Sequence, residues 1–393
     1  MIDSYKEALG EFDFSRSIRR DLHRHPELAF QEYRTADEIT KNLKKLDLEV
    51  TNGLAKTGVL ALIEGVDPGP CILLRFDMDA LPIVEQNLTD YTSINSGVMH
   101  ACGHDGHVAI GLTVARILSN HRQDFKGSIK LLFQPAEEGA GGAESMISSG
   151  SLKNPEVVRC LGLHIWNEKP LGWLGISSGP VMASAGSFTI RLTGKGGHAA
   201  MPHLTIDPVV AAAQVIVAAQ TITSRNTDPK LACVISFCAI RSGEAFNIIP
   251  NQVEMKGTLR AFEPEVKEIA TKRLQEIANG IGEAMGCTVE FLFESITNAV
   301  INDPQVTSIV KRAAENIFPD FLIDWSGQTT MASEDFSFYQ KEIPGTFFFV
   351  GSANSTLGYT YSHHHPRFDF DEKVLPIGAA LMAQAAVDLL GSL

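Results

Sequence analysis

Acidic and imidazole side chains follow several short apolar runs of this sequence, close to where each run ends. Five such residues stand at these places: Asp77, Asp79, Glu137, Glu138 and His164. If the runs are parallel strands of one sheet, their carboxyl ends meet at one edge, where ligands usually bind. Four carboxylates gathered there would repel one another and lose hydration unless cations neutralised them. The pattern therefore predicts a cation site.

Two histidine-rich segments supply further ligand types. The run HACGHDGH occupies residues 100–107 just before a predicted helix, and SHHHP occupies residues 362–366 near the other end of the chain. A thiolate, imidazoles and carboxylates together suit zinc or a similar late first-row ion, because this ligand set is borderline-soft. A bound cation would also hold Cys102 as its thiolate.

Each segment also has an explanation without a metal. A single histidine such as His104 at a helix start is more often a hydrogen-bonded structural residue than a ligand. A Glu-Glu pair is usually solvated surface charge, and residues 363–365 by themselves read as a surface turn before Pro366. The joint occurrence of these segments at predicted strand ends favours the metal site.

Composition narrows the class of protein. The chain has 393 residues, which suggests roughly two domains, and a formal net charge of −13. Its scattered acidic residues disfavour nucleic acids and anionic membranes as partners. Residues 1–20 lack the apolar core of a signal peptide and no segment is expected to span a bilayer, so a cytoplasmic location is predicted. Apart from Cys102, the cysteines lie in apolar runs typical of buried core residues.

The first half of the sequence predicts an α/β sheet covered on both faces. Near-continuous apolar runs separated by helical stretches are typical of buried parallel strands. The predicted strands are residues 58–63, 71–76, 129–133 and 160–163, with a helix at 108–119.

From about residue 187 the pattern changes to half-exposed, alternating strands. Their order with two helices is βαββαβ, a ferredoxin-like unit. The predicted elements are strands at 188–192, 232–240, 253–261 and 289–293, and helices at 209–222 and 265–285. A near-continuous apolar strand, as in the first half of the chain, is predicted again at 346–350, and an apolar helix follows at 376–390. We therefore predict a large α/β catalytic domain with a mostly parallel sheet (1–184 and 296–393), interrupted by an inserted ferredoxin-like lid or dimerisation domain (185–295).

These segments resemble the amidohydrolase branch of the M20 metallopeptidases, which includes aminoacylases, hippurate hydrolases and auxin-conjugate hydrolases. The resemblance covers nearly the whole chain and keeps one order of motifs. The matching segments are RRDLHRHPELAFQE (19–32), RFDMDALP (75–82), HACGHDGH (100–107), QPAEEG (134–139), GLHIW (162–166), GKGGHAAMP (194–202), SEDF (333–336) and HHHP (363–366).

The resemblance implies a centre of two divalent cations, of which zinc, manganese, cobalt and nickel all suit the ligands. Cys102 would bridge them, and the other implied ligands are His104, Glu138, His164 and His364. The last is chosen because the family places its ligand two residues before the proline, although His363 and His365 stand beside it. The wider family often has a histidine two residues before the aspartate matched by Asp79. This chain has Asp77 there, which leaves Asp77 without an assigned role, while Asp79 would orient a ligand.

The resemblance also implies a mechanism. Amide hydrolysis needs an activated water, a polarised carbonyl and a proton donor for the amine; metal ions can supply the first two, and Glu137 would act as general base and then as acid. In the insert, His198 would hydrogen-bond the tetrahedral intermediate, often from the partner subunit of a homodimer. Asn247 and Arg260 would hold the substrate carboxylate.

The predicted function is hydrolysis of the amide bond of small N-acyl-L-amino acids. One alternative is a dipeptidase or carboxypeptidase on the same scaffold. Another is a metal-binding protein without catalysis, which the presence of Glu137 disfavours.

Overall fold

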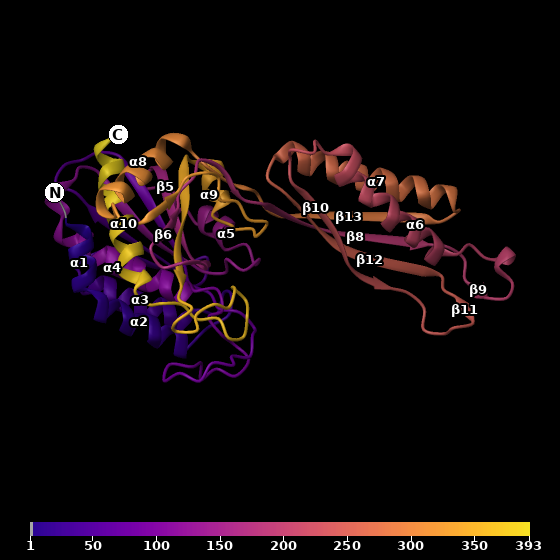
Figure 1. The fold of residues 1–393 in the computed structure, drawn as a ribbon, viewed down its shortest axis with the longest axis horizontal. Coiled ribbons are helices and arrows are strands. Elements are labelled where there is room, and N and C mark those ends of the chain that lie inside the picture. The colour runs from indigo at the N-terminus through magenta and orange to yellow at the C-terminus, as the bar shows by residue number, and fades with distance from the viewer. Residues whose placement is uncertain (1–2) are drawn as a thin grey trace. The chain divides into compact units, whose positions relative to one another are not determined.

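Apolar runs of the sequence form the central strands of an eight-stranded sheet (Figure 1). The computed structural model describes residues 3–393, so Met1 and Ile2 of the predicted 1–184 domain lie outside the described residues. The chain forms two compact units, one of residues 1–181, 301–328 and 335–393, the other of residues 182–300 and 329–334. The predicted domain boundaries stay predictions.

The sheet of the first unit has the order β1-β2-β4-β3-β5-β16-β6-β15. Its middle strands β4, β3, β5 and β16 run parallel, whereas β1, β2 and β4 pair antiparallel. The predicted mostly parallel α/β sheet is therefore confirmed. The strands are β1 (Glu49–Leu54), β2 (Gly58–Glu64), β3 (Cys71–Asp77), β4 (Ser128–Gln134), β5 (Val157–Pro170), β6 (Trp173–Gly175), β15 (Leu322–Asp324) and β16 (Gly345–Ala353).

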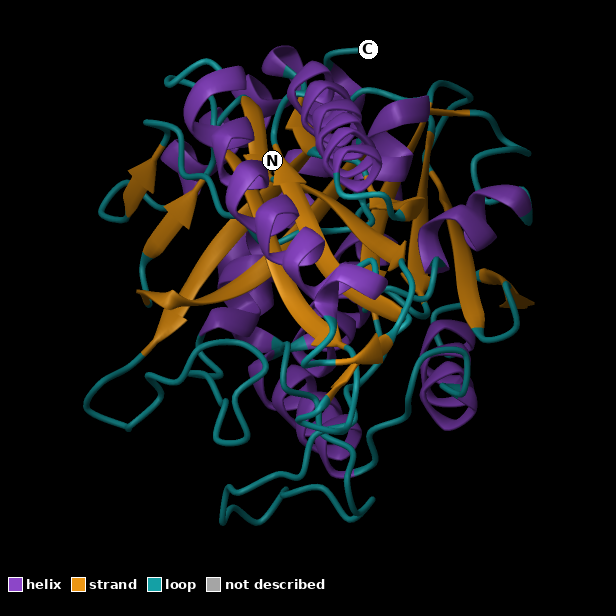
Figure 2. Cartoon of the chain, turned by 90° about the vertical axis from the view of Figure 1, so that its right-hand side faces the viewer, coloured by secondary structure: helices purple, strands orange, loops and turns teal. Residues whose placement is uncertain are grey.

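Helices cover this sheet, which explains why every residue of β3 and β4 is buried. Figure 1 shows α4 and α10 on one side of the sheet and α5 and α9 on the other, and Figure 2 shows the layers from a second direction. The helices of this unit are α1 (Ser4–Gly10), α2 (Phe12–Arg24), α3 (Tyr33–Lys44), α4 (His104–Asn120), α5 (Gly142–Ser148), α8 (Pro304–Ile317), α9 (Ser337–Glu342) and α10 (Val374–Gly391).

Helix α10 is long and apolar enough to cross a membrane, but 78% of it is buried inside the unit, as in the core helix of a folded domain. One expected strand was too short. The strand expected to end at Leu163 continues to Pro170 as β5, because β16 pairs with it up to Trp166 and beyond. Pairing with β3 ends earlier, at Gly162, so His164 lies two residues past the last residue that pairs with β3.

The second unit contains a four-stranded antiparallel sheet of order β10-β12-β8-β13. Its elements follow the predicted βαββαβ sequence: β8 (Ser184–Thr193), α6 (Pro208–Thr221), β10 (Cys233–Arg241), β12 (Gln252–Ala261), α7 (Pro264–Ala284) and β13 (Thr288–Thr297). Alternate residues of β8 are buried, because one face of the sheet packs against the helices. Inward-facing Ile190 and Leu192 share a core with Val215 of α6 and Leu274 of α7.

Candidate metal centre

The five predicted ligands converge in the first unit. One ligand atom each of Cys102, His104 and His164 lies within 4.8 Å of the others, and the same is true of Cys102, Glu138 and His364. Cys102 therefore belongs to two adjoining groups. A thiolate shared between two groups is the arrangement that a bridging ligand requires.

The two imidazoles at the deepest part of the centre are oriented through Nδ1. His104 Nδ1 donates to the carbonyl oxygen of Asp79 at 2.9 Å, and His164 Nδ1 donates to that of Ile165 at 2.6 Å. Because a carbonyl only accepts, both rings carry the proton on Nδ1 and present the lone pair of Nε2. His164 Nε2 lies 3.5 Å from Cys102 Sγ, and His104 Nε2 is buried without a hydrogen-bond partner.

An unpartnered buried nitrogen is costly, and a cation would satisfy it. The charges agree with this interpretation. Burial and the carboxylates of Glu138 and Glu137 hold the pKa of the Cys102 thiol well above its ordinary value. Burial alone would lower the pKa of His104, but Asp77 and Asp79 raise it to about 10. The pocket therefore favours positive charge, and the donor set fits divalent cations.

His107 supports the centre without joining it, and Asp77 lies against the centre, with its Oδ1 3.8 Å from His104 Nε2. His107 Nδ1 donates to Asp77 at 2.5 Å, and its Nε2 accepts from the backbone N–H of Ile165 at 2.9 Å, so neither nitrogen remains for a metal. Burial would raise the pKa of Asp77, but the neighbouring His104, His107 and Arg75 lower it well below its usual range. These contacts give Asp77 the structural role that the sequence left open.

Asp79 contacts three parts of the centre. Its carboxylate accepts from the backbone N–H groups of Glu137 at 3.0 Å and Glu138 at 3.1 Å, and its Oδ1 lies 3.3 Å from His104 Nδ1. This carboxylate therefore fixes the turn that carries both glutamates, together with the ring of His104. The contacts support an orienting role.

The three consecutive histidines have different surroundings. His364 Nε2 lies 3.1 Å from Glu138 Oε1, whereas His363 Nε2 donates to the carbonyl of Ile165 at 2.9 Å. The ring of His365 stacks on Tyr361 with centroids 4.4 Å apart. The ring of His363 also packs against His164, with centroids 5.1 Å apart, but among the described residues His364 alone of the three belongs to a candidate ligand group, which supports its choice.

The remaining predicted residues belong to the second unit. His198 lies opposite Ile248 in a short ladder, and Ala199 donates its N–H to the carbonyl of Asn247 at 3.1 Å, so His198 and Asn247 are neighbours. Arg260 lies near the far end of β12, where it donates to Thr258 Oγ1 and the carbonyl of Leu259. Within this unit the structure therefore separates Arg260 from His198 and Asn247.

A buried ion-pair network next to the centre was missed from the sequence. The Arg19 guanidinium donates to Asp105 at 2.8 Å and to Asp369 at 2.6 Å, and His23 Nδ1 lies 2.8 Å from Asp105. The network ties α2 and the C-terminal segment to the residue after His104. The only sequence signal was the charged motif of residues 19–32, which does not reveal partners 86 or 350 residues away.

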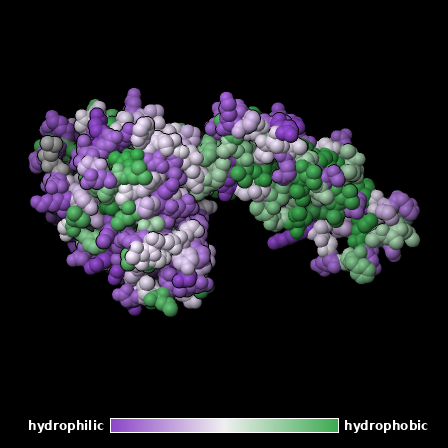
Figure 3. Space-filling model, viewed as in Figure 1, coloured by the Kyte–Doolittle hydropathy of each residue, from purple (hydrophilic) through white to green (hydrophobic). Residues whose placement is uncertain are grey.

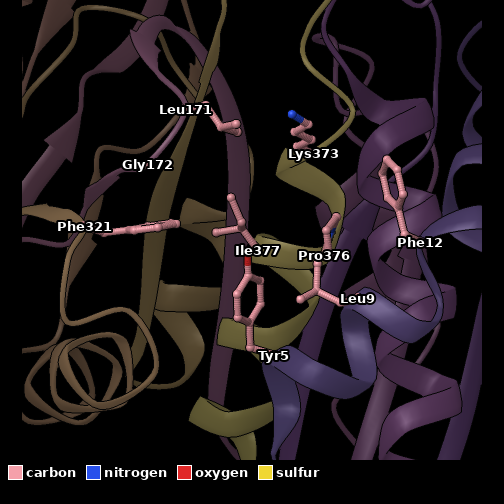
Figure 4. Close-up of a pocket in the computed structure, with 9 residues that line it drawn as sticks. All are labelled: Tyr5, Leu9, Phe12, Leu171, Gly172, Phe321, Lys373, Pro376 and Ile377. Atoms are coloured by element: carbon pink, nitrogen blue, oxygen red, sulfur yellow. The ribbon is translucent and has the colours of Figure 1, made fainter.

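An apolar cavity elsewhere in this unit is not the reaction site. It has a volume of about 340 Å³ and contains none of the predicted ligands or catalytic residues. Figure 4 shows its lining residues: Tyr5, Leu9, Phe12, Leu171, Gly172, Phe321, Lys373, Pro376 and Ile377.

A buried cluster of one thiol, imidazoles and carboxylates at the end of a mostly parallel sheet is the site of a metal-dependent hydrolase. Residues 73–388 match the family described as Peptidase family M20/M25/M40, and the chain belongs to this family.

Relatives agree in length and fold. The chain is 37% identical to an N-acetylcysteine deacetylase of Bacillus subtilis, over 95% of this chain and 96% of that one. It is 38% identical to thermostable carboxypeptidase 1 of Saccharolobus solfataricus, over 98% of both chains. The crystal structure of Bacillus subtilis YXEP, described as a dinuclear metal-binding peptidase of the M20 family, superposes with a TM-score of 0.86. That match has 34% identity and covers 98% of this chain and 100% of the other.

Replacing the shared ligand tests the centre. We expect Cys102→Ala to lower the bound metal from two ions per chain to one or none, because the thiol belongs to both groups. Elemental analysis of desalted protein measures this. Cys160→Ala is the matched control, because Cys160 is an equally buried thiol in β5 outside the groups; equal metal loss in both variants would contradict the assignment.

His23 predicts a pH dependence of stability. Burial alone would lower its pKa, but Asp105 raises it to about 9. Since the folded value lies above the unfolded value of about 6.5, this stabilisation is complete at lower pH and is lost as the pH rises through about 9. The difference in melting temperature between the natural chain and His23→Gln should thus be largest near pH 6 and shrink towards pH 10. A constant difference would refute this.

Proposed function

We propose that this hydrolase cleaves the amide bond of N-acyl-L-amino acids, releasing a carboxylate and a free amino acid. The observation that carries the proposal is the presence of Glu137 beside a pair of adjoining ligand groups that share Cys102. The similarity to an N-acetylcysteine deacetylase supports an acylated amino acid as substrate. The proposed ligands are Cys102, His104, Glu138, His164 and His364.

Two divalent cations in this centre, whether zinc, manganese, cobalt or nickel, would acidify water and stabilise negative charge on the carbonyl oxygen. Glu137 takes the proton of the attacking water and later delivers it to the departing nitrogen. Glu137 Oε1 accepts from the backbone N–H of Asp335 at 3.4 Å, whereas Glu138 Oε1 lies 3.1 Å from His364 Nε2. Asp79 holds the N–H groups of both glutamates, so the base and the ligand keep a fixed separation.

The second unit supplies substrate contacts in this proposal. His198 stabilises the tetrahedral intermediate, while Asn247 and Arg260 bind the substrate carboxylate. Because Arg260 lies at the other end of β12 from His198 and Asn247, we infer that the two groups serve different centres of a homodimer.

An exposed apolar face of α6 supports the homodimer. Val209, Val210 and Val217 are exposed there, Val217 to 67%, and Figure 3 shows hydrophobic residues concentrated over this unit. Exposed apolar patches commonly mark protein contacts. We infer that this face of α6 contacts a second copy of the chain.

A peptidase on the same scaffold is the second candidate, because the chain is similar to thermostable carboxypeptidase 1 over its whole length. The two candidates differ in whether the acyl group carries a free amine.

The substrate assignment is tested with N-acetyl and N-benzoyl amino acids beside dipeptides and longer peptides. We expect turnover of the acyl amino acids, and an exclusive turnover of peptides would favour the second candidate.

Glu137→Gln should lower kcat by at least about a hundredfold, the usual scale of general base catalysis, with unchanged metal content. A fully active Glu137→Gln variant would contradict the assigned base.

Complementation tests whether His198 acts on the partner's centre. His198→Ala and Cys102→Ala should each be inactive alone. After mixing under conditions that exchange subunits, half of the dimers are mixed and each has one intact centre, so about a quarter of the natural activity should return. If mixed dimers are demonstrated by tagged copies and no activity returns, action across the interface is refuted.

Val217→Asp should shift the equilibrium from the dimer to the monomer, and light scattering measures the molar mass.

A further inference from the structure

We propose that Glu32 is a positioning residue that sets the direction of Glu137 by holding the backbone N–H of Ala136. This inference deepens the proposed function, since it rests on Glu137 as the base. Glu32 ends the motif of residues 19–32, and none of the proposed ligand or substrate contacts uses it.

The carboxylate of Glu32 is completely buried, with 0% exposure. Its Oε1 accepts from the N–H of Ala136 at 3.0 Å and its Oε2 from Thr57 Oγ1 at 2.6 Å. It forms no ion pair with a basic side chain in the described part of the chain. Burial raises the pKa of Glu32, partly offset by the hydrogen bond from Thr57. A buried carboxylate without a cation is costly, so its retention points to a specific task.

That task is visible at Ala136, which adopts a left-handed backbone with φ of 58°. This conformation is unfavourable for a residue with a Cβ, so surrounding contacts must maintain it. The N–H of Ala136 is held by Glu32, and its carbonyl accepts from Gly142 N–H at 3.1 Å. A Cβ at Gly142 would lie 1.8 Å from the carbonyl oxygen of Pro135, so the turn is closely packed as well.

Together, Glu32 and Asp79 bind three consecutive N–H groups. Glu32 accepts from residue 136, and Asp79 accepts from Glu137 and Glu138. Successive N–H groups around a left-handed residue form a concave anion site, or nest, and here two carboxylates of the chain itself fill it. The backbone direction at which Glu137 leaves the turn is therefore fixed from both sides.

Glu32 is the better residue of the pair to test. Asp79 also contacts His104, so its replacement would disturb a ligand. The carboxylate of Glu32 accepts from Ala136 N–H and Thr57 Oγ1, and neither residue is a proposed ligand. Replacing Glu32 therefore tests the orientation of Glu137 without removing a proposed metal ligand.

The test compares Glu32→Ala with Glu32→Gln, whose amide oxygen can still accept from Ala136. We expect Glu32→Ala to lower kcat by about 10- to 100-fold, the scale of a small misplacement of a catalytic group, with KM and metal content within about twofold. Glu32→Gln should recover most of the loss. Hydrogen exchange of the amides of residues 136–138 should be faster in Glu32→Ala, a readout that does not depend on activity.

Glu27→Ala is the matched control, because this acid holds the N–H groups of Arg34 and Thr35 at the start of α3 and does not touch the turn. It should lower the melting temperature without lowering kcat. If Glu32→Ala does not fold, Ala136→Val should give the same loss of kcat, because a β-branched residue disfavours the left-handed conformation.

The outcomes are distinguishable. Natural kcat in folded, metal-loaded Glu32→Ala, or unchanged exchange at residues 136–138, would overturn the positioning role. A chain that turns over neither acyl amino acids nor peptides, yet exchanges faster at these amides in Glu32→Ala, would instead refute the proposed function alone.

Discussion

Buried negative charge at the end of the parallel strands is the constraint on which this structure depends. A thiol, four carboxylates and several imidazoles approach one another there, and Cys102, His104 and His164 are buried while His364 is exposed. Such a cluster is stable only if positive charge is present. Part of that charge comes from the chain, since Arg75 pairs with Asp77 and Asp335. Divalent cations would supply the rest beside His104 Nε2, which is buried without a hydrogen-bond partner.

Hydrogen bonds around the cluster decide what each side chain can do. Carbonyl groups fix the protons of His104 and His164 on Nδ1, which leaves Nε2 for a metal. His107 has the same residue type and nearly the same place, but its two nitrogens are both occupied. A histidine here can bind a metal only if one ring nitrogen is left for it. His104 and His164 meet this condition and His107 does not.

The apolar patterns predicted the central strands and the βαββαβ unit, because burial on one or both faces of an element sets the spacing of its apolar residues. An error arose where a pairing partner, rather than the apolar pattern, set the limit of a strand. Strand β5 extends past Leu163 because β16 continues beside it. Helix α10 is apolar on all sides because the core surrounds it, and a bilayer would demand the same composition.

The sequence by itself determined the residue types, their order and the periodicity of the elements, and these suffice for the family and the kind of chemistry. Only the tertiary structure decided which of residues 363–365 faces Glu138 and that Asp77 binds His107. It also decided that Glu32 reaches Ala136, 104 residues away. The physical reason is that hydrogen bonds and ion pairs between distant segments depend on distances and angles, and a linear pattern of residues records neither.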